Sequence, residues 1–172
     1  AAVSMAVSGY PALAIGGALA QLASIIDGCD GEIARLKHSQ SEFGGWFDAV
    51  LDRYADAFLL FGLTWHAYAA SPIRDVLITF TGDRGGAIVL VVGFLAIIGS
   101  FMNSYTADKY DSLMKAKFSK GKGIRIGRDV RILLIVVCAV CNLPLVGLIV
   151  LAILMNVETV RRVVVCYRNE QH

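Results

Sequence analysis

The chain has 172 residues, and 56% of them are hydrophobic, above the roughly 45–50% of an average soluble protein. Its 16 Lys and Arg nearly balance its 14 Asp and Glu, so the formal net charge is only +2. This balance argues against a strongly basic nucleic-acid-binding domain, and the excess of apolar residues predicts an integral membrane protein.

Five apolar stretches predict an all-α bundle of about five transmembrane helices, because each is close to the roughly 20 residues that cross a hydrocarbon core. Gly9 and Pro11 begin the first stretch, and Ser71-Pro72 ends the second. The second stretch is amphipathic where it begins, so its first turns should face protein or water rather than lipid. The expected helices cover residues 9–34, 44–70, 86–110, 124–141 and 144–166.

Basic residues are distributed unequally between the two ends of these helices. Only Arg74 and Arg84 fall between the second and third helices, and none lies in the turn Asn142-Leu143-Pro144 between the last two. The remaining basic residues flank the opposite ends, which the positive-inside rule assigns to the cytoplasm. We therefore expect a cell-membrane protein whose C-terminus and first helix connection face the cytoplasm.

Residues 1–8 precede the first full helix. Five spans with a cytoplasmic C-terminus would leave the N-terminus outside, yet the chain starts at Ala1 without a signal-peptide charge pattern. We interpret Ala1 to Ser8 as the tail of an earlier helix. Residues 1–172 are then one membrane domain that lacks its first transmembrane helix and any cytoplasmic domain upstream of it.

Four carboxylates lie around the connection between the first two helices. Asp27 and Asp30 are three residues apart and Asp48 and Asp52 four apart, so each pair shares one face of its helix. Ionisable groups in membrane helices are costly and are usually functional. A divalent cation would relieve their mutual repulsion, and hard oxygen ligands favour Mg²⁺, Mn²⁺ or Ca²⁺ over zinc.

Two neighbouring features are interpreted as structural. Cys138 and Cys141 form a lone C-x-x-C, which has too few ligands for a zinc site. Asp56 continues the row of carboxylates on the second helix but drifts off their face. We expect Asp56 to pair with Arg53 or with a neighbouring helix.

Residues 27–52 read D-x2-D-G-x2-A-R-x8-G-x3-D-x3-D, which resembles the signature of the CDP-alcohol phosphotransferase family at all eight of its fixed positions. The resemblance implies a membrane fold of six helices and a homodimer, in which Gly93, Gly99 and Gly147 of the later helices are candidates for the interface. It also implies a metal-dependent transferase. Such an enzyme moves a substituted phosphate group from a CDP-linked donor to an acceptor alcohol and releases CMP.

The same resemblance assigns roles to the carboxylates. Asp27, Asp30, Asp48 and Asp52 would bind one or two Mg²⁺ or Mn²⁺ ions. Asp52 would also be the general base that takes the proton of the acceptor hydroxyl.

Four further positions would contact the CDP donor: Gly31, Ala34, Arg35 and Gly44. Small side chains there would let a nucleotide approach the backbone, and a planar guanidinium suits a phosphate group. The structural alternatives are close helix packing for the glycines and alanine and an interfacial position for the arginine.

Basic residues cluster before and at the start of the fourth helix. Arg125, Arg128 and Arg131 recur every three residues, so they would form a guanidinium ladder at a helix N-terminus. With Lys109 they predict a site for the phosphate of a phosphorylated acceptor. Lys115 to Lys122 fit better as a loop attracted to anionic lipid.

Within the family, the segments Gly127–Arg131 and Leu51–Asp56 look most like the branch that uses inositol phosphate. The expected reaction joins CDP-inositol to inositol 1-phosphate and gives di-myo-inositol phosphate phosphate, in proteins often fused to a cytidylyltransferase domain. The alternatives within the family are synthases of phosphatidylinositol phosphate, archaetidylinositol phosphate or phosphatidylglycerophosphate, which act in phospholipid biosynthesis.

Two functions of other classes compete with this prediction. A divalent-cation transporter would spread its carboxylates along a path across the bilayer, whereas these crowd one end of the helices. A non-catalytic membrane scaffold would give no reason for the pattern at Gly31, Ala34 and Arg35. We therefore expect an enzyme.

Overall fold

The structure is a computed structural model that describes residues 1–7, 9–36, 41–70, 79, 82, 84–117 and 127–170, with the backbone alone described at 30–32, 34–36, 42, 108–117 and 169–170. These residues form helices and turns without a strand, which confirms the all-α prediction. The helices are α1 (Ala2–Ala6), α2 (Tyr10–Leu36), α3 (Glu42–Ala70), α5 (Arg84–Lys117), α6 (Arg128–Val140) and α7 (Pro144–Glu170).

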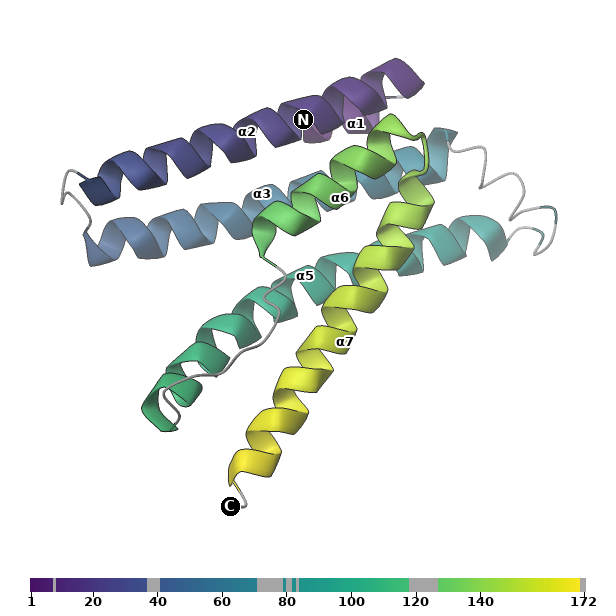
Figure 1. The fold of residues 1–172 in the computed structure, drawn as a ribbon. Helices are drawn as coiled ribbons and strands as arrows, with labels where there is room; N and C mark the ends of the chain where they lie inside the picture. The colour runs from purple at the N-terminus through teal and green to yellow at the C-terminus, as the bar shows by residue number, and fades with distance from the viewer. Residues whose placement is uncertain are drawn as a thin grey trace.

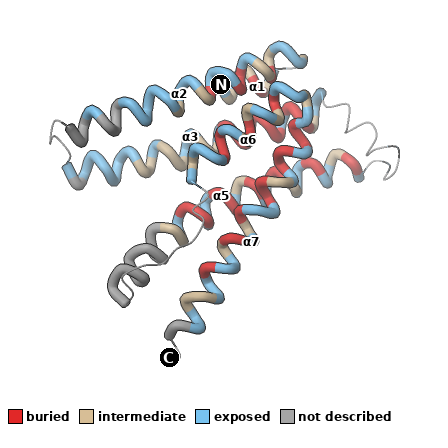
Figure 2. Tube along the Cα trace, viewed as in Figure 1, coloured by how far each residue is buried: buried red, intermediate tan, exposed pale blue. Residues whose placement is uncertain are grey.

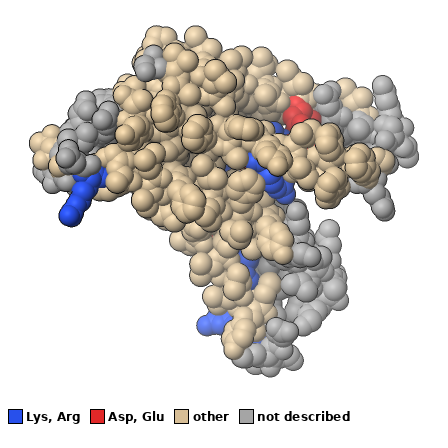
Figure 3. All heavy atoms as spheres, turned by 180° about the vertical axis from the view of Figure 1, so that it is seen from behind, with Lys and Arg blue, Asp and Glu red and all other residues tan. Residues whose placement is uncertain are grey.

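Among the described helices, two are long and apolar enough to cross a membrane, at Tyr10–Cys29 and Arg84–Ala107. The expected count of five spans is therefore not confirmed. With 13 residues, α6 is shorter than the roughly 20 that cross a hydrocarbon core, and α3 carries Asp52 and Asp56 among its apolar residues. Seen from behind, the described surface is nonetheless a broad uncharged area with isolated charged side chains (Figure 3).

The helices pack as one connected bundle. The most extensive pairing joins α5 to α7, and α1 packs against both α2 and α3, α6 against α2, and α3 against α5. The end of α2 and the start of α3 lie together at one side of the molecule, and the turn between α6 and α7 lies at the other (Figure 1). Direct contact between α2 and α3 is sparse, so their facing sides are open to polar groups from α6.

Buried side chains from all of the described helices form the apolar core, and most of them belong to α3, α5, α6 and α7 (Figure 2). Met5, Leu13, Leu63, Leu148 and Met155 are among its completely buried side chains. The last turns of α2 that are described and the first turns of α3 are mostly exposed. Asp27, Asp48 and Asp52 therefore lie outside the core, where solutes can reach them.

Three glycines allow close helix packing within the chain. A Cβ at Gly93 would collide with Thr64 on α3, and a Cβ at Gly99 would lie 2.5 Å from Asn156 Nδ2 on α7. At Gly147 it would lie 2.9 Å from Cys138 Cβ on α6. The expectation that these glycines line a dimer interface is wrong, because helices of the same chain already occupy the space beside them.

The turn between α6 and α7 is short because Asn142 adopts a left-handed conformation, with φ of 56°. The N–H of Asn142 donates to the carbonyl oxygen of Ala139 at 3.2 Å, and the N–H of Leu143 donates to that of Cys138 at 2.8 Å. These bonds satisfy the last carbonyls of α6, and Pro144 can begin α7 because the first turn of a helix needs no donor there.

Candidate active site

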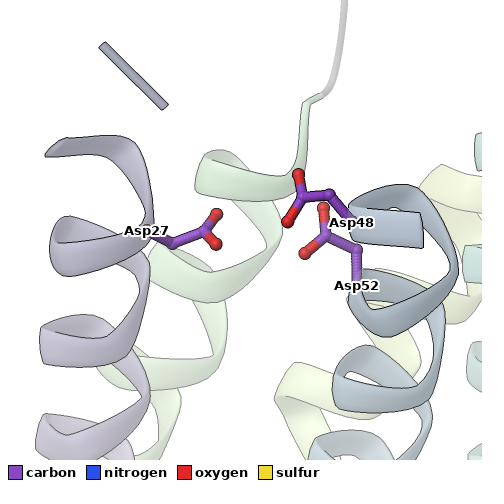
Figure 4. Close-up of side chains that lie close together, drawn as sticks. All are labelled: Asp27, Asp48 and Asp52. Atoms are coloured by element: carbon purple, nitrogen blue, oxygen red, sulfur yellow. The ribbon is translucent and has the colours of Figure 1, made fainter. Parts of the chain in front are cut away.

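Three of the four predicted metal ligands meet between α2 and α3. Asp27 on α2 and Asp48 and Asp52 on α3 each place a carboxylate oxygen within 4.8 Å of the others. Figure 4 shows the three side chains pointing toward one another from the two helices. The spacing of four residues puts Asp48 and Asp52 on one face of α3, as predicted. The side chain of Asp30 lies outside the described part of the chain.

Arg128, the first residue of α6, reaches into this acidic cluster. Its Nη1 atom lies 2.6 Å from Asp27 Oδ2 and also 2.6 Å from Asp52 Oδ1. The Arg128 and Asp52 side chains are each 21% exposed, and that of Asp27 is 44% exposed. One guanidinium nitrogen therefore joins α2, α3 and α6 through charge-assisted hydrogen bonds.

Arg131 lies one turn further along α6 and is buried. Its Nη2 lies 2.8 Å from Asp56 Oδ2, and its Nη1 donates to Ser100 Oγ at 2.6 Å and to Ser104 Oγ at 3.2 Å. Asp56 thus has a partner on a neighbouring helix, which was one of the two predicted alternatives. A phosphate that used Arg131, as predicted for the acceptor, would have to replace these bonds.

Ser100 and Ser104 were not singled out by the sequence, although they belong to this network. Ser100 also donates to Asp56 Oδ2 at 3.4 Å. The available signal was two serines one turn apart in an otherwise apolar helix, a pattern that marks polar contacts between membrane helices. The identity of their partner could not be inferred, because it depends on how α5 and α6 pack.

The chemistry of the acidic cluster fits a divalent cation. Its three carboxylates supply the hard oxygen atoms that Mg²⁺ and Mn²⁺ prefer. Oxygens of Asp27 and Asp52 already converge on one positively charged nitrogen, so the two helices are placed to share a cation. Asp27, Asp48 and Asp52 would hold it, together with Asp30 by the family resemblance.

Gly44, predicted to contact the donor, also has a local role at the start of α3. Its N–H donates to Ser41 Oγ at 3.0 Å, which caps the helix. A Cβ at this position would lie 2.9 Å from the same oxygen. The cap therefore explains a small residue here without excluding a donor contact.

The remaining predicted residues are described only in part or not at all. Gly31, Ala34 and Arg35 lie in the last turns of α2, and Lys109 lies in α5, where the backbone alone is described. Arg125 lies outside the described residues. Of the predicted guanidinium ladder, Arg128 and Arg131 are therefore the two members whose contacts are known.

A cavity of about 220 Å³ lies beside Arg128 and Asp56. Arg128 and Asp56 contribute its charged wall, and Ala20, Ala23 and Ala55 contribute part of its apolar wall. The small alanine side chains leave this space beside the two charged residues.

Comparison with known proteins gives two kinds of match. The family described as CDP-alcohol phosphatidyltransferase matches residues 2–164. A bifunctional IPC transferase and DIPP synthase from Rubrobacter xylanophilus is 34% identical over 156 residues, which cover 91% of this chain and 32% of that protein.

Two further relatives extend this picture. A protein of the same name from Aquifex aeolicus is 29% identical over 170 residues, which cover 94% of this chain and 35% of that protein. An archaetidylinositol phosphate synthase from Pyrococcus horikoshii is 29% identical over 152 residues, covering 87% of this chain and 68% of that protein. The chain thus spans about a third of the length of the two bifunctional relatives.

Proposed function

Because the chain belongs to the CDP-alcohol phosphatidyltransferase family, we propose that it transfers a substituted phosphate group from a CDP-linked donor to an acceptor alcohol and releases CMP. The family predicted from residues 27–52 is confirmed by this membership. The observation that carries the proposal is the meeting of Asp27, Asp48 and Asp52 between α2 and α3, because transfer at a diphosphate requires a site that gathers cations.

In the proposed reaction, the acceptor oxygen forms a bond to the phosphorus that bears the donor's alcohol, and the bond from that phosphorus to CMP breaks. A bound Mg²⁺ or Mn²⁺ would neutralise the negative charge on the phosphate oxygens. Asp27 from α2 and Asp48 and Asp52 from α3 would hold the cation. Asp52 accepts the proton of the acceptor hydroxyl, a role that suits a carboxylate within the cluster and less exposed than Asp27.

For the substrates, we propose CDP-inositol and inositol 1-phosphate, which give di-myo-inositol phosphate phosphate. Two of the relatives carry DIPP synthase in their names, and Arg128 supplies positive charge beside the reaction centre. Lys109, Arg125 and Arg131 would add to an acceptor-phosphate site. The second candidate is a phospholipid synthase, because another relative is named archaetidylinositol phosphate synthase.

We further propose that residues 1–172 are the membrane domain of a longer protein. This protein would form a homodimer, and its active site would face the cytoplasm. The bifunctional names of two relatives support a fused cytidylyltransferase domain upstream. The basic residues at the ends of α2 and α7 support the orientation.

The test is a product assay on purified protein with Mg²⁺. CDP-inositol and a lipid CDP donor are each combined with inositol 1-phosphate, glycerol 3-phosphate or free inositol, and CMP and the phosphodiester product are measured. We expect turnover with CDP-inositol and inositol 1-phosphate. Turnover with the lipid donor alone would favour the phospholipid synthase, and no CMP release from any pair would contradict the proposed activity.

A substitution tests the proposed base. Asp52→Asn should lower CMP release by about 10²–10⁴-fold, because general-base catalysis contributes rates of that order. Asp129→Asn is the matched control, since it removes one exposed carboxylate of α6. Full activity in the Asp52 variant would exclude this residue as the base.

A further inference from the structure

Arg128 lies between two of the aspartates that would bind a cation. Its Nη1 atom lies 2.6 Å from an oxygen of Asp27 and 2.6 Å from an oxygen of Asp52. We propose that Arg128 is an internal counter-ion that a divalent cation displaces from these two carboxylates, so that cation binding and arginine release are one exchange step. The inference rests on the proposed function, since it takes the cation to bind at this cluster.

The two positive partners exclude each other for geometric and electrostatic reasons. Mg²⁺ binds oxygen at about 2.0–2.1 Å, so an ion shared by Asp27 and Asp52 would compete with Arg128 Nη1 for the carboxylates that it contacts. A guanidinium left in place would lie within a few ångströms of the ion, where like charges repel strongly in a site partly shielded from water. Cation binding at Asp27 and Asp52 therefore requires Arg128 to move.

The surroundings provide Arg128 with a second acidic partner. Its Nε is buried and has no hydrogen-bond partner among the described residues, and it lies 4.0 Å from Asp56 Oδ1. Asp56 is fixed by Arg131 at 2.8 Å, so it stays in place when Arg128 moves. Both Arg128 and Asp56 border the cavity of about 220 Å³, which gives the displaced guanidinium room.

The exchange orders the binding of ligands. Without the cation, the Arg128 guanidinium is paired with Asp27 and Asp52, so it is not available to a substrate. With the cation bound, Arg128 is free to bind a phosphate group of a substrate. By reciprocity, the cation should raise the affinity for a phosphate-bearing ligand, and that ligand should raise the affinity for the cation.

The first experiment measures Mn²⁺ binding to the purified protein without nucleotide or alcohol. Arg128→Gln should bind Mn²⁺ about tenfold more tightly than the unchanged protein, because the competing charge is gone. Arg168→Gln, which removes one exposed charge in the last turn of α7, should change the affinity less than twofold. Equal or weaker Mn²⁺ binding by the Arg128 variant would overturn the exchange.

A second measurement needs no variant. Phenylglyoxal modifies accessible guanidinium groups, and mass spectrometry gives the rate at each arginine. Mg²⁺ should speed the modification of Arg128 several-fold and leave Arg168 unchanged. A rate at Arg128 that Mg²⁺ leaves unchanged or lowers would overturn the proposal.

The outcomes separate this inference from the proposed function. An exchange that is observed in a protein without CMP release supports the inference and overturns the enzymatic proposal. CMP release with no change at Arg128 upholds the enzyme and overturns the inference. A protein that binds no Mn²⁺ in any form overturns both.

Discussion

Asp48 differs from its two neighbours in the acidic cluster, because none of its described contacts is an ion pair, whereas Asp27 and Asp52 share Arg128. Its carboxylate adds to the negative charge of the cluster without a described arginine to offset it. This asymmetry separates the proposed role of Asp48 in cation binding from any role in holding the helices together.

We predict that Asp48→Asn weakens Mn²⁺ binding about tenfold or more, because affinity follows the number of charged ligands. Without metal, the unfolding midpoint should stay the same or rise, since one repelling charge is removed. Titration with Mn²⁺ and thermal unfolding with chelator measure the two effects. A lower midpoint in chelator would show instead that Asp48 stabilises the metal-free fold.

The pair of Asp56 and Arg131 is the most enclosed part of the polar network, with side chains 12% and 7% exposed. We predict that Arg131→Met destabilises the protein by about 3–5 kcal/mol, because it leaves a buried carboxylate without its arginine. The double variant Asp56→Leu/Arg131→Met should recover more than half of that loss, since replacing both members of a buried pair is often neutral.

Reversible unfolding in mixed micelles gives the free energies of unfolding of the unchanged protein, the Arg131→Met variant and the double variant. Stability that returns in the double variant while CMP release does not would show that Asp56 and Arg131 serve the active site as well as the fold. If CMP release also returned, Asp56 and Arg131 would have no part in positioning Arg128.

At the scale of helices, the sequence predicted α2, α3, α5 and α7 closely, because apolar length and Gly or Pro at the ends mark helices independently of their neighbours. α6 begins at Arg128 rather than at 124, since Gly127 is its N-cap and residues 124–126 lie outside the described part. The carboxylate row of α3 was also predictable from a spacing of four.

Helix partners could not be predicted in the same way. Glycine in a membrane helix permits close approach of any helix, so Gly99 fits a dimer interface and a contact within the chain equally well until the fold is known. The partner of Asp56 is a similar case, because it depends on the packing of α3 against α6. The counter-ion position of Arg128 likewise requires three helices to meet.

We predict that Gly99→Val destabilises the protein by about 1–3 kcal/mol or more, because the new side chain would force Asn156 and Met155 apart from α5. Gly45→Ala is the control, since nothing lies within 4 Å of a Cβ there, and it should be neutral or slightly stabilising. Unfolding midpoints at matched detergent concentration test this. An unchanged midpoint for Gly99→Val would show that α5 and α7 pack more loosely than described.

For the whole molecule, two native cysteines test the orientation in the membrane. Cys29 and Cys141 are both exposed and lie near opposite ends of the bundle, in α2 and just after α6. By the positive-inside rule, a membrane-impermeant maleimide should label a variant with Cys141 alone in intact cells. A variant with Cys29 alone should react in inverted vesicles.

Solubilised protein is the control, because both variants should react once the membrane is dispersed. Labelling of Cys29 from outside intact cells would reverse the predicted orientation and place the acidic cluster away from cytosolic nucleotides.

The division of charges among the helices also bears on how the chain is made. Asp27, Asp52 and Asp56 belong to α2 and α3, whereas Arg128 and Arg131 belong to α6, and the whole of α5 lies between them. During translation, the carboxylates therefore leave the ribosome before the arginines that pair with them. Nascent chains that stop before Arg128 therefore carry Asp27 and Asp52 without the arginine that pairs with both in the folded protein.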